Sequence, residues 1–268
     1  MLTTDYHIHT SFSHDSQAPL LEMCRAAAAR GMTEICITEH LDFDRSDLDY
    51  SELDWDAYAA AVAEACSLYA GRMTIRIGVE FDFRRSYGPE VGRVVGRLPV
   101  DFAIGSVHSS AGCPLFRLRK GVPAGFDIRR VLAEYFDEVE ALAATGWCHV
   151  LGHFEYLYKQ IPAIVGPVRD DWYWQKVDGI LRQCIASGVG IEANMHHTLD
   201  GCAMAADLEI LHRYRALGGR LVTVGSDAHR PEEVAGDFGR AEETLRTAGF
   251  DQVCGYQGGR PYFVPIGR

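Results

Sequence analysis

The chain has no apolar run that approaches the roughly 20 residues needed for a membrane-spanning helix, which argues against a helical membrane protein. Its first residues, MLTTDYHIHT, lack the basic stretch and the apolar stretch of a secretory signal, so we expect a cytoplasmic location. Positive charge is also scarce, since the formal net charge is −11. Proteins that bind nucleic acids usually present a basic face, so we expect neither a nucleic-acid partner nor a membrane partner.

Two familiar motifs are missing as well. None of the eight cysteines belongs to a C-x-x-C pair, the spacing typical of zinc ribbons and of dithiol redox sites. In a cytoplasmic chain we therefore expect buried free thiols rather than disulfides. No G-x-G-x-x-G motif follows the first predicted strand, which argues against a dinucleotide-binding fold.

What the chain does contain is a regular alternation of short apolar runs and longer amphipathic runs along its 268 residues. The short runs have the length and composition of buried strands, and they cover residues 5–9, 34–39, 73–81, 101–108, 147–153, 189–195 and 220–227. The longer runs have helical spacing, and most of them end at glycine, a common C-cap. They cover residues 18–31, 54–71, 127–146, 170–188, 203–219 and 230–250.

This alternation predicts parallel strands joined by right-handed crossovers. A (β/α) barrel of seven strands closes such a sheet most simply, with residues 260–266 (RPYFVPI) as a candidate eighth strand. An open, doubly wound sheet is the alternative. Because no linker or repeat interrupts the pattern, we expect one α/β domain over residues 1–268.

Histidines and acidic residues stand at the carboxyl ends of the predicted strands. His7 and His9 are two positions apart on the first strand, so their side chains face the same way. In parallel α/β folds the functional groups lie at these strand ends, and closing the barrel would bring them together. The nine candidate ligands are His7, His9, Asp15, His40, Glu80, His108, His153, Asp227 and His229.

Imidazoles and carboxylates without thiolates suit Zn²⁺, Fe²⁺ and Mn²⁺. A catalytic zinc commonly takes three protein ligands, so nine candidates predict two or three divalent ions rather than one. Clusters of this kind clamp phosphoryl oxygens and lower the pKa of bound water towards ~7. The ligand set therefore indicates a metal-dependent hydrolase, and the ions would also offset the acidity of the chain towards an anionic substrate.

The stretches DYHIHTSFSHDS, TEH, GVE, SVH, GH and GSDAH resemble, in order and spacing, the motifs of the PHP (polymerase and histidinol phosphatase) family. The likeness covers nearly the whole chain and is greatest to the stand-alone histidinol-phosphate phosphatases. It implies a distorted, TIM-barrel-like (β/α)7 barrel with a trinuclear metal site at the C-terminal ends of the strands. It also implies hydrolysis of a small phosphorylated substrate, L-histidinol phosphate, in histidine biosynthesis.

The resemblance also implies a role for each candidate ligand. His7, His9 and Asp227 match ligands of a first metal, Glu80 matches the carboxylate that bridges to a second, His108 and His153 complete the second, and Asp15, His40 and His229 match the third. Our hypothesis is that a metal-bridging hydroxide, held by Glu80 and Asp227, attacks phosphorus in line. His14 stands one position out of register and is expected at the rim of the site.

The chain departs from these relatives at two phosphate-binding positions. Where they carry arginine in the patterns G-H-x-D-Y-x-x-R and E-x-N-x-R, this sequence has Lys159 in GHFEYLYK and His196 in EANMH. Lysine keeps a positive charge but loses the bidentate fork of arginine. We predict substrate contacts from Lys159 and His196, with Arg117 and Arg119 of the loop CPLFRLRKG at the rim.

These exchanges leave alternatives open. The enzyme could act on another small phosphate ester or a nucleotide, and a non-catalytic or nuclease-type PHP module is a further alternative. Asp82 and Glu155 are candidates to face a cationic amine on the substrate. A homo-oligomer is compatible with the sequence.

Overall fold

A computed structural model describes residues 1–44, 50, 52–196 and 203–267, without the side chains of residues 203–207. Its main sheet has seven parallel strands in the order β1-β2-β3-β4-β7-β8-β9. The strands are β1 (Thr4–Asp5), β2 (Glu34–Leu41), β3 (Thr74–Asp82), β4 (Phe102–Ser106), β7 (Val150–Leu151), β8 (Gly190–Asn194) and β9 (Val222–Gly225). Sequence order and spatial order agree, as expected for successive strand–helix units.

Backbone hydrogen bonds between the first and last strands close this sheet. Tyr6 N donates to Val224 O at 2.8 Å, Asp227 N donates to His7 O at 2.8 Å, and His9 N donates to Ala228 O at 2.9 Å. Regular pairing in β1 is short, but the chain from residue 5 to residue 9 continues between β2 and β9. The sheet is therefore a distorted seven-stranded barrel, and the open-sheet alternative is wrong.

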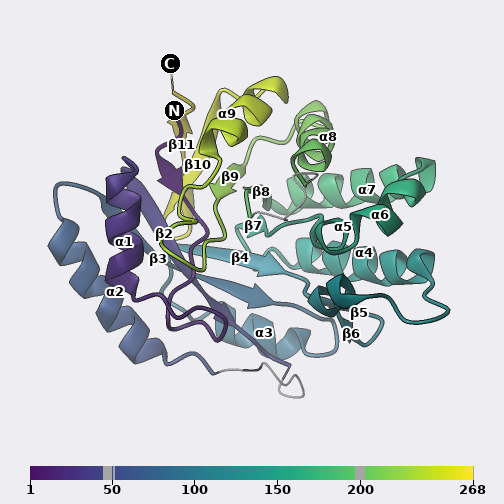
Figure 1. Ribbon diagram of the computed structural model, residues 1–268, viewed down its shortest axis with the longest axis horizontal. Coiled ribbons are helices and arrows are strands. Elements are labelled where there is room, and N and C mark those ends of the chain that lie inside the picture. The colour runs from purple at the N-terminus through teal and green to yellow at the C-terminus, as the bar shows by residue number, and fades with distance from the viewer. Residues whose placement is uncertain (45–49, 51, 197–202, 268) are drawn as a thin grey trace.

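Helices surround the barrel (Figure 1). The longer ones are α1 (Leu20–Ala29), α2 (Trp55–Tyr69), α3 (Gly88–Val95), α4 (Ile128–Thr145), α7 (Asp171–Ser187), α8 (Ala203–Ala216) and α9 (Phe238–Thr247). Aspartate side chains cap three of them, with Asp54, Asp127 and Asp170 each accepting a hydrogen bond from a first-turn amide. Gly146 and Gly188 end α4 and α7 in the left-handed conformation that favours glycine. None of the described helices combines the length and apolar composition that crossing a bilayer requires.

Short elements connect β4 to α7 above the carboxyl ends of the strands. They are β5 (Ser109–Ser110), β6 (Cys113–Pro114), the 3₁₀ helix η1 (Leu115–Lys120), α5 (Tyr156–Gln160), α6 (Pro162–Val165) and the 3₁₀ helix η2 (Gly166–Val168). The sequence pattern predicts none of these as separate elements, because each spans six residues or fewer.

The candidate eighth strand is not part of the barrel. Residues 260–266 contribute to β11 (Arg260–Pro265), which pairs antiparallel with β10 (Gln252–Gln257) in a separate hairpin. Gly258 and Gly259, with φ of 53° and 74°, form its two-residue turn. A hairpin reverses the chain at once, so β11 cannot supply another parallel strand.

The hairpin closes the amino-terminal end of the barrel instead. Tyr256 N donates to the hydroxyl of Tyr6 at 2.7 Å, and Gly258 N donates to Asp101 Oδ1 at 2.7 Å. Together with the barrel interior it builds a second buried cluster of Tyr6, Cys36, Phe102, Ile104, Val150, Cys254 and Tyr256. The seven described cysteines are free thiols, as predicted; Cys202 lies outside the described residues.

Candidate metal centre

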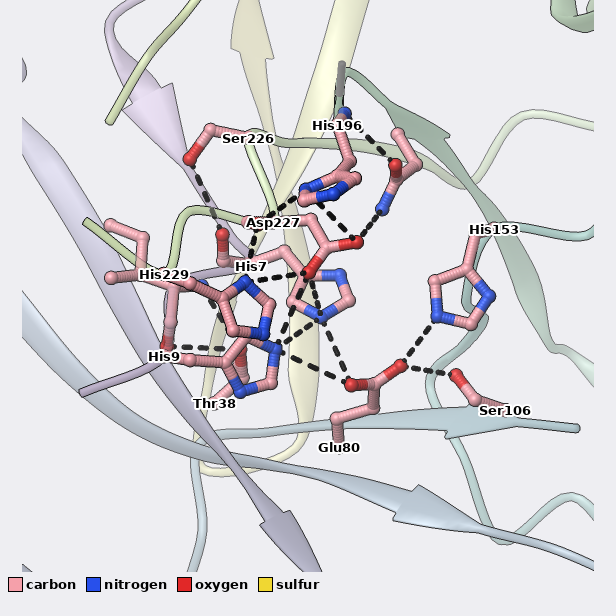
Figure 2. A network of polar contacts seen from close by, with 12 residues as sticks. His7, His9, Thr38, Glu80, Ser106, His153, His196, Ser226, Asp227 and His229 are labelled. Carbon is pink, nitrogen blue, oxygen red and sulfur yellow. Dashed lines mark hydrogen bonds and ion pairs between the residues drawn. The ribbon is translucent and has the colours of Figure 1, made fainter. Parts of the chain in front are cut away.

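Glu80, at the carboxyl end of β3, lies at the centre of the site. Its Oε2 atom is 3.2 Å from His7 Nε2 and 3.4 Å from His9 Nε2, both on the segment that follows β1. Asp227, just after β9, places its Oδ1 atom 3.6 Å from His7 Nε2 and 3.5 Å from His9 Nε2. Figure 2 shows these side chains turned towards one another. They form a first cluster of four ligand atoms.

The second carboxylate oxygen of Glu80 belongs to another cluster. Oε1 is 2.7 Å from Nε2 of His153, which follows β7, and 3.5 Å from Nε2 of His108, which follows β4. The two imidazoles are 3.3 Å apart at these atoms. Glu80 therefore has one oxygen in each of two neighbouring clusters, as a bridging carboxylate would.

Three further candidates meet on the other side of His9. Asp15 Oδ2 is 3.3 Å from Nε2 of His40 and 3.0 Å from Nε2 of His229. The rings of His40 and His229 both stack against the His9 ring, with centroid distances of 4.2 and 4.4 Å, and are 6.2 Å from each other. All nine side chains singled out by the sequence thus come together in one region.

Neighbouring acceptors orient the histidine rings. His7 Nδ1 is 2.6 Å from Glu192 Oε1, and His229 Nδ1 is 2.9 Å from the carbonyl oxygen of Asp227. Because these acceptors carry no proton, Nδ1 must donate, which leaves Nε2 with a lone pair in the neutral ring. His9 Nδ1 lies 3.1 Å from Ser13 Oγ, whose own hydrogen is given to Glu39. Metal-binding histidines are usually oriented by a partner at the other ring nitrogen.

The Nε2 atoms of His7 and His9 can both face one cation when the two rings are neutral. His7 Nε2 and His9 Nε2 are 3.0 Å apart, and their Nδ1 partners leave a lone pair on each. Ligand atoms around a zinc ion at ordinary bond lengths are ~3.3 Å apart. The distances of 3.0–3.6 Å in the first cluster fit that spacing. The donor set and its geometry therefore fit a divalent metal ion.

Both central carboxylates are ionised. Burial raises the pKa of Glu80, but electrostatic attraction to the neighbouring imidazoles of His7 and His153 outweighs this effect and holds the pKa well below its usual range. The pKa of Asp227 is likewise well below its usual value, because His7 and His196 outweigh the effect of burial. Buried anions of this kind need positive charge nearby, and bound metal ions would supply it.

Two glycines allow the strands to approach this closely. A Cβ on Gly225 would lie 2.3 Å from both Glu192 Oε1 and His7 Cβ. A Cβ on Gly152 would lie 2.4 Å from Ser106 Oγ and 3.5 Å from Glu80 Oε1. Gly152 directly precedes His153, and Gly225 lies two residues before Asp227.

The backbone is strained at two of the candidate ligands. His153 has φ of 23° and Asp227 has φ of 53°, a region that non-glycine residues rarely adopt. Such conformations cost about 1–3 kcal/mol each and cluster at functional sites.

Three of the four predicted substrate contacts line a cavity of about 360 Å³ beside these clusters. Lys159, His196 and Arg119 line it, whereas Arg117 is not among the lining residues and places its guanidinium 5.6 Å from the centroid of the Phe116 ring. Lys159 is 6 % exposed, and its Nζ atom donates to Asn194 Oδ1. His196 Nδ1 donates to the carbonyl oxygen of Asp227 at 2.9 Å, so Nε2 is the ring nitrogen that can reach a ligand.

Residues outside the predicted set support the ligands. Glu192 on β8 holds His7 and also accepts from His153 N at 2.8 Å, while Glu39 on β2 accepts from the Thr10 and Ser13 hydroxyls. The sequence alternation in β8 could have identified Glu192. This residue lies two positions from Asn194 and therefore on the same face of the strand, the face from which Asn194 contacts Lys159.

The remaining candidates occupy other positions around the site. Asp82 lies 3.5 Å from His108 Nδ1, and Glu155 lies 3.3 Å from Arg169, so both carboxylates have partners within the protein. His14 lies 3.4 Å from Asp42 and lines a second, adjoining cavity of about 420 Å³. Its ring stacks on that of His40 with a centroid distance of 5.1 Å, so it stands at the rim of the site, at the edge of the nine clustered side chains.

Fold and site together define the class of protein: a seven-stranded β/α barrel with a divalent-metal site at the carboxyl ends of its strands. Residues 5–196 match the PHP domain, and the chain belongs to this family.

Similar proteins extend over nearly the full length. A histidinol-phosphatase of Lactococcus lactis is 25% identical over 263 residues, covering 96% of both chains. A probable histidinol-phosphatase of Deinococcus radiodurans is 26% identical over 266 residues, covering 91% of this chain and 93% of its own. The crystal structure of histidinol phosphate phosphatase from Lactococcus lactis, complexed with zinc, L-histidinol and phosphate, matches 97% of this chain and 98% of its own with a TM-score of 0.83 at 22% identity. That structural likeness establishes a shared fold.

Proposed function

We propose that the protein is a metal-dependent phosphomonoester hydrolase that converts L-histidinol phosphate into L-histidinol and phosphate. The observation that carries this proposal is the bridging position of Glu80, with one oxygen in each of two ligand clusters beside a cavity that contains a buried lysine. Full-length relatives named as histidinol-phosphatases support the choice of substrate. The reaction belongs to histidine biosynthesis.

Three ions account for the nine ligands. His7, His9, Asp227 and Glu80 would hold the first, Glu80, His108 and His153 the second, and Asp15, His40 and His229 the third. These ligands suit zinc, iron or manganese. When bound, the ions supply concentrated positive charge to the phosphoryl oxygens and lower the pKa of bound water.

The side chains of the cavity position the phosphate ester. Lys159 is buried, and within the described part of the chain no carboxylate lies within ion-pair distance of its ammonium, so its charge is available to a phosphoryl oxygen. Arg119 approaches from η1 on the rim. His196, held by the carbonyl of Asp227, presents Nε2, which in the imidazolium form carries a proton that can be given to the leaving alkoxide.

The test is to replace Glu80 with Gln. An amide cannot carry the negative charge that both clusters share, so the variant should lose most turnover on L-histidinol phosphate and bind fewer metal ions per chain. Metal content is measured by elemental analysis and phosphate release by a colorimetric assay. Glu243→Gln, on an exposed position of α9, is the matched control and should behave as the wild type.

Two results would contradict the proposal separately. Near-normal activity of Glu80→Gln would reject the bridging role of this residue. A wild-type enzyme that clearly prefers another phosphate ester in a panel of monoesters and nucleotides would reject L-histidinol phosphate as the substrate but leave the metal-dependent hydrolysis intact.

A further inference from the structure

Gln160, the last residue of α5, is a buried polar residue that the proposed mechanism does not use. It is 6 % exposed and lines the same cavity as the ligand clusters. Its Oε1 atom has no hydrogen-bond partner within the described part of the chain. Leaving a buried acceptor unpaired destabilises a folded protein, and a water, an ion or a ligand that completes the site is one explanation for such an atom.

The position of Gln160 indicates which part of a substrate it could contact. Tyr156, Lys159 and Gln160 all line the cavity, as residues at i, i+3 and i+4 on one helix face do. Lys159 is the residue we assign to the phosphate, and consecutive Cα atoms are only ~3.8 Å apart. Because both side chains line one cavity of about 360 Å³, a substrate whose phosphate binds Lys159 can place a neighbouring group against Gln160.

The chemistry of Gln160 Oε1 limits which group of the substrate it can bind. An unpaired carbonyl oxygen requires a donor, and rotation about the last side-chain bond, a broad torsion, can turn it towards the cavity. In L-histidinol phosphate the donor next to the ester is the ammonium group, which is separated from the ester oxygen by two carbons. The imidazole lies further along the molecule.

We propose that Gln160 is a substrate-binding residue whose side-chain carbonyl accepts a hydrogen bond from an ammonium group two carbons from the ester oxygen. This inference rests on the proposed function. Such a contact makes the enzyme selective for 2-aminoalkyl phosphates, because Lys159 binds the phosphate and Gln160 binds the neighbouring amine.

The test compares O-phosphoethanolamine with propyl phosphate, which differ only in an ammonium group in place of a methyl group. The wild type should show a higher kcat/KM for O-phosphoethanolamine. Gln160→Met keeps the length of the side chain but removes the acceptor, so the ratio of the two kcat/KM values should fall about tenfold or more, the usual effect of a hydrogen bond to a charged group. Gln183→Met, on the outer helix α7 where Gln183 donates to Ser187, is the matched control and should keep the wild-type ratio.

A second variant and a stability measurement separate recognition from damage to the fold. Gln160→Glu retains an acceptor, so its ratio should stay at or above the wild-type value. The ligand-free Gln160→Met protein should unfold at the same temperature as the wild type or higher, because an unpaired buried amide has been removed. A ratio within twofold of the wild type in Gln160→Met, or one that falls only with a lower unfolding temperature, would overturn the inference.

The same experiment distinguishes this inference from the proposed function. Activity of the wild type on L-histidinol phosphate is measured first, and its absence would contradict the proposed function itself. Normal wild-type activity combined with an unchanged ratio in Gln160→Met would reject only the role of Gln160.

Discussion

Replacing Glu192 with Gln should weaken metal binding although Glu192 is not a proposed ligand. Glu192 Oε1 accepts from His7 Nδ1 at 2.6 Å, while Oε2 accepts from His153 N at 2.8 Å and from Asn194 Nδ2 at 3.1 Å. Every one of these partners is a donor, so only a group with two acceptor oxygens satisfies them all. An amide has one acceptor and one donor end.

Either orientation of the glutamine would disturb the site. With its NH₂ group towards His153, two donors meet and two hydrogen bonds to a buried carboxylate are lost. With its NH₂ group towards His7, the imidazole must accept at Nδ1 and carry its proton on Nε2, the atom that faces Glu80 and Asp227. Loss of such an orienting partner typically lowers metal affinity 10–100-fold, which is about 1.4–2.7 kcal/mol.

The assay is a metal titration against a competing chelator, followed by activity at saturating metal. The variant should need 10–100-fold more free metal for half occupancy, and part of its activity should return at high metal concentration. Glu209→Gln on α8, where Glu209 pairs with Arg213 on the outer surface, is the control. Unchanged metal affinity in Glu192→Gln would refute the reasoning that the orientation of His7 depends on this carboxylate.

Two other predictions follow from close packing and from burial. Gly225→Ala would place a methyl group 2.3 Å from Glu192 Oε1 and His7 Cβ, so we expect about 1–3 kcal/mol lower stability in urea unfolding and weaker metal binding; wild-type values for both would show that the strands can separate freely. Burial lowers the pKa of His149 from 6.5 to about 4, so the folded state favours the neutral ring. This preference contributes fully to the unfolding free energy above about pH 6.5. The contribution is lost as the pH falls towards about 4. The amount is at most roughly 3 kcal/mol, less for partial exposure, and His149→Gln should flatten the dependence of the unfolding free energy on pH in this window; an unchanged slope would contradict it.

The sequence predicted the barrel and the clustering of the ligands because both follow from periodic features. Strand ends such as CITEH and VGSD place His40 and Asp227 at the same edge of a parallel sheet, and this edge is where functional groups gather. The spacing of apolar residues also predicted α4 and α7 to within one or two residues of their observed ends. Glycine at the C-cap supplied the carboxyl-terminal boundaries, and the structure shows that Asp127 and Asp170 cap the amino-terminal ends.

Other features depend on contacts between distant residues, which local patterns do not record. The first strand has only two regularly paired residues because the chain from Tyr6 to His9 bonds irregularly to both neighbouring strands. Whether RPYFVPI joined the barrel depended on the turn at Gly258 and Gly259. The sequence did not predict a role for Gln160, because a single glutamine in a five-residue helix belongs to no motif. Its significance comes from the cavity that it lines.

The closure of the sheet by hydrogen bonds between β1 and β9 has a consequence for how the protein acquires its metal. His7 and Asp227 come from opposite ends of the chain, so the first ion can be held only after the most distant pairing in the topology has formed. Pairings of such large sequence separation form slowly, and an ion that binds both residues adds its binding energy to the folded state alone. Binding of metal between His7 and Asp227 would thus stabilise the closed barrel, and removal of the metal would weaken the contact between its first and last strands.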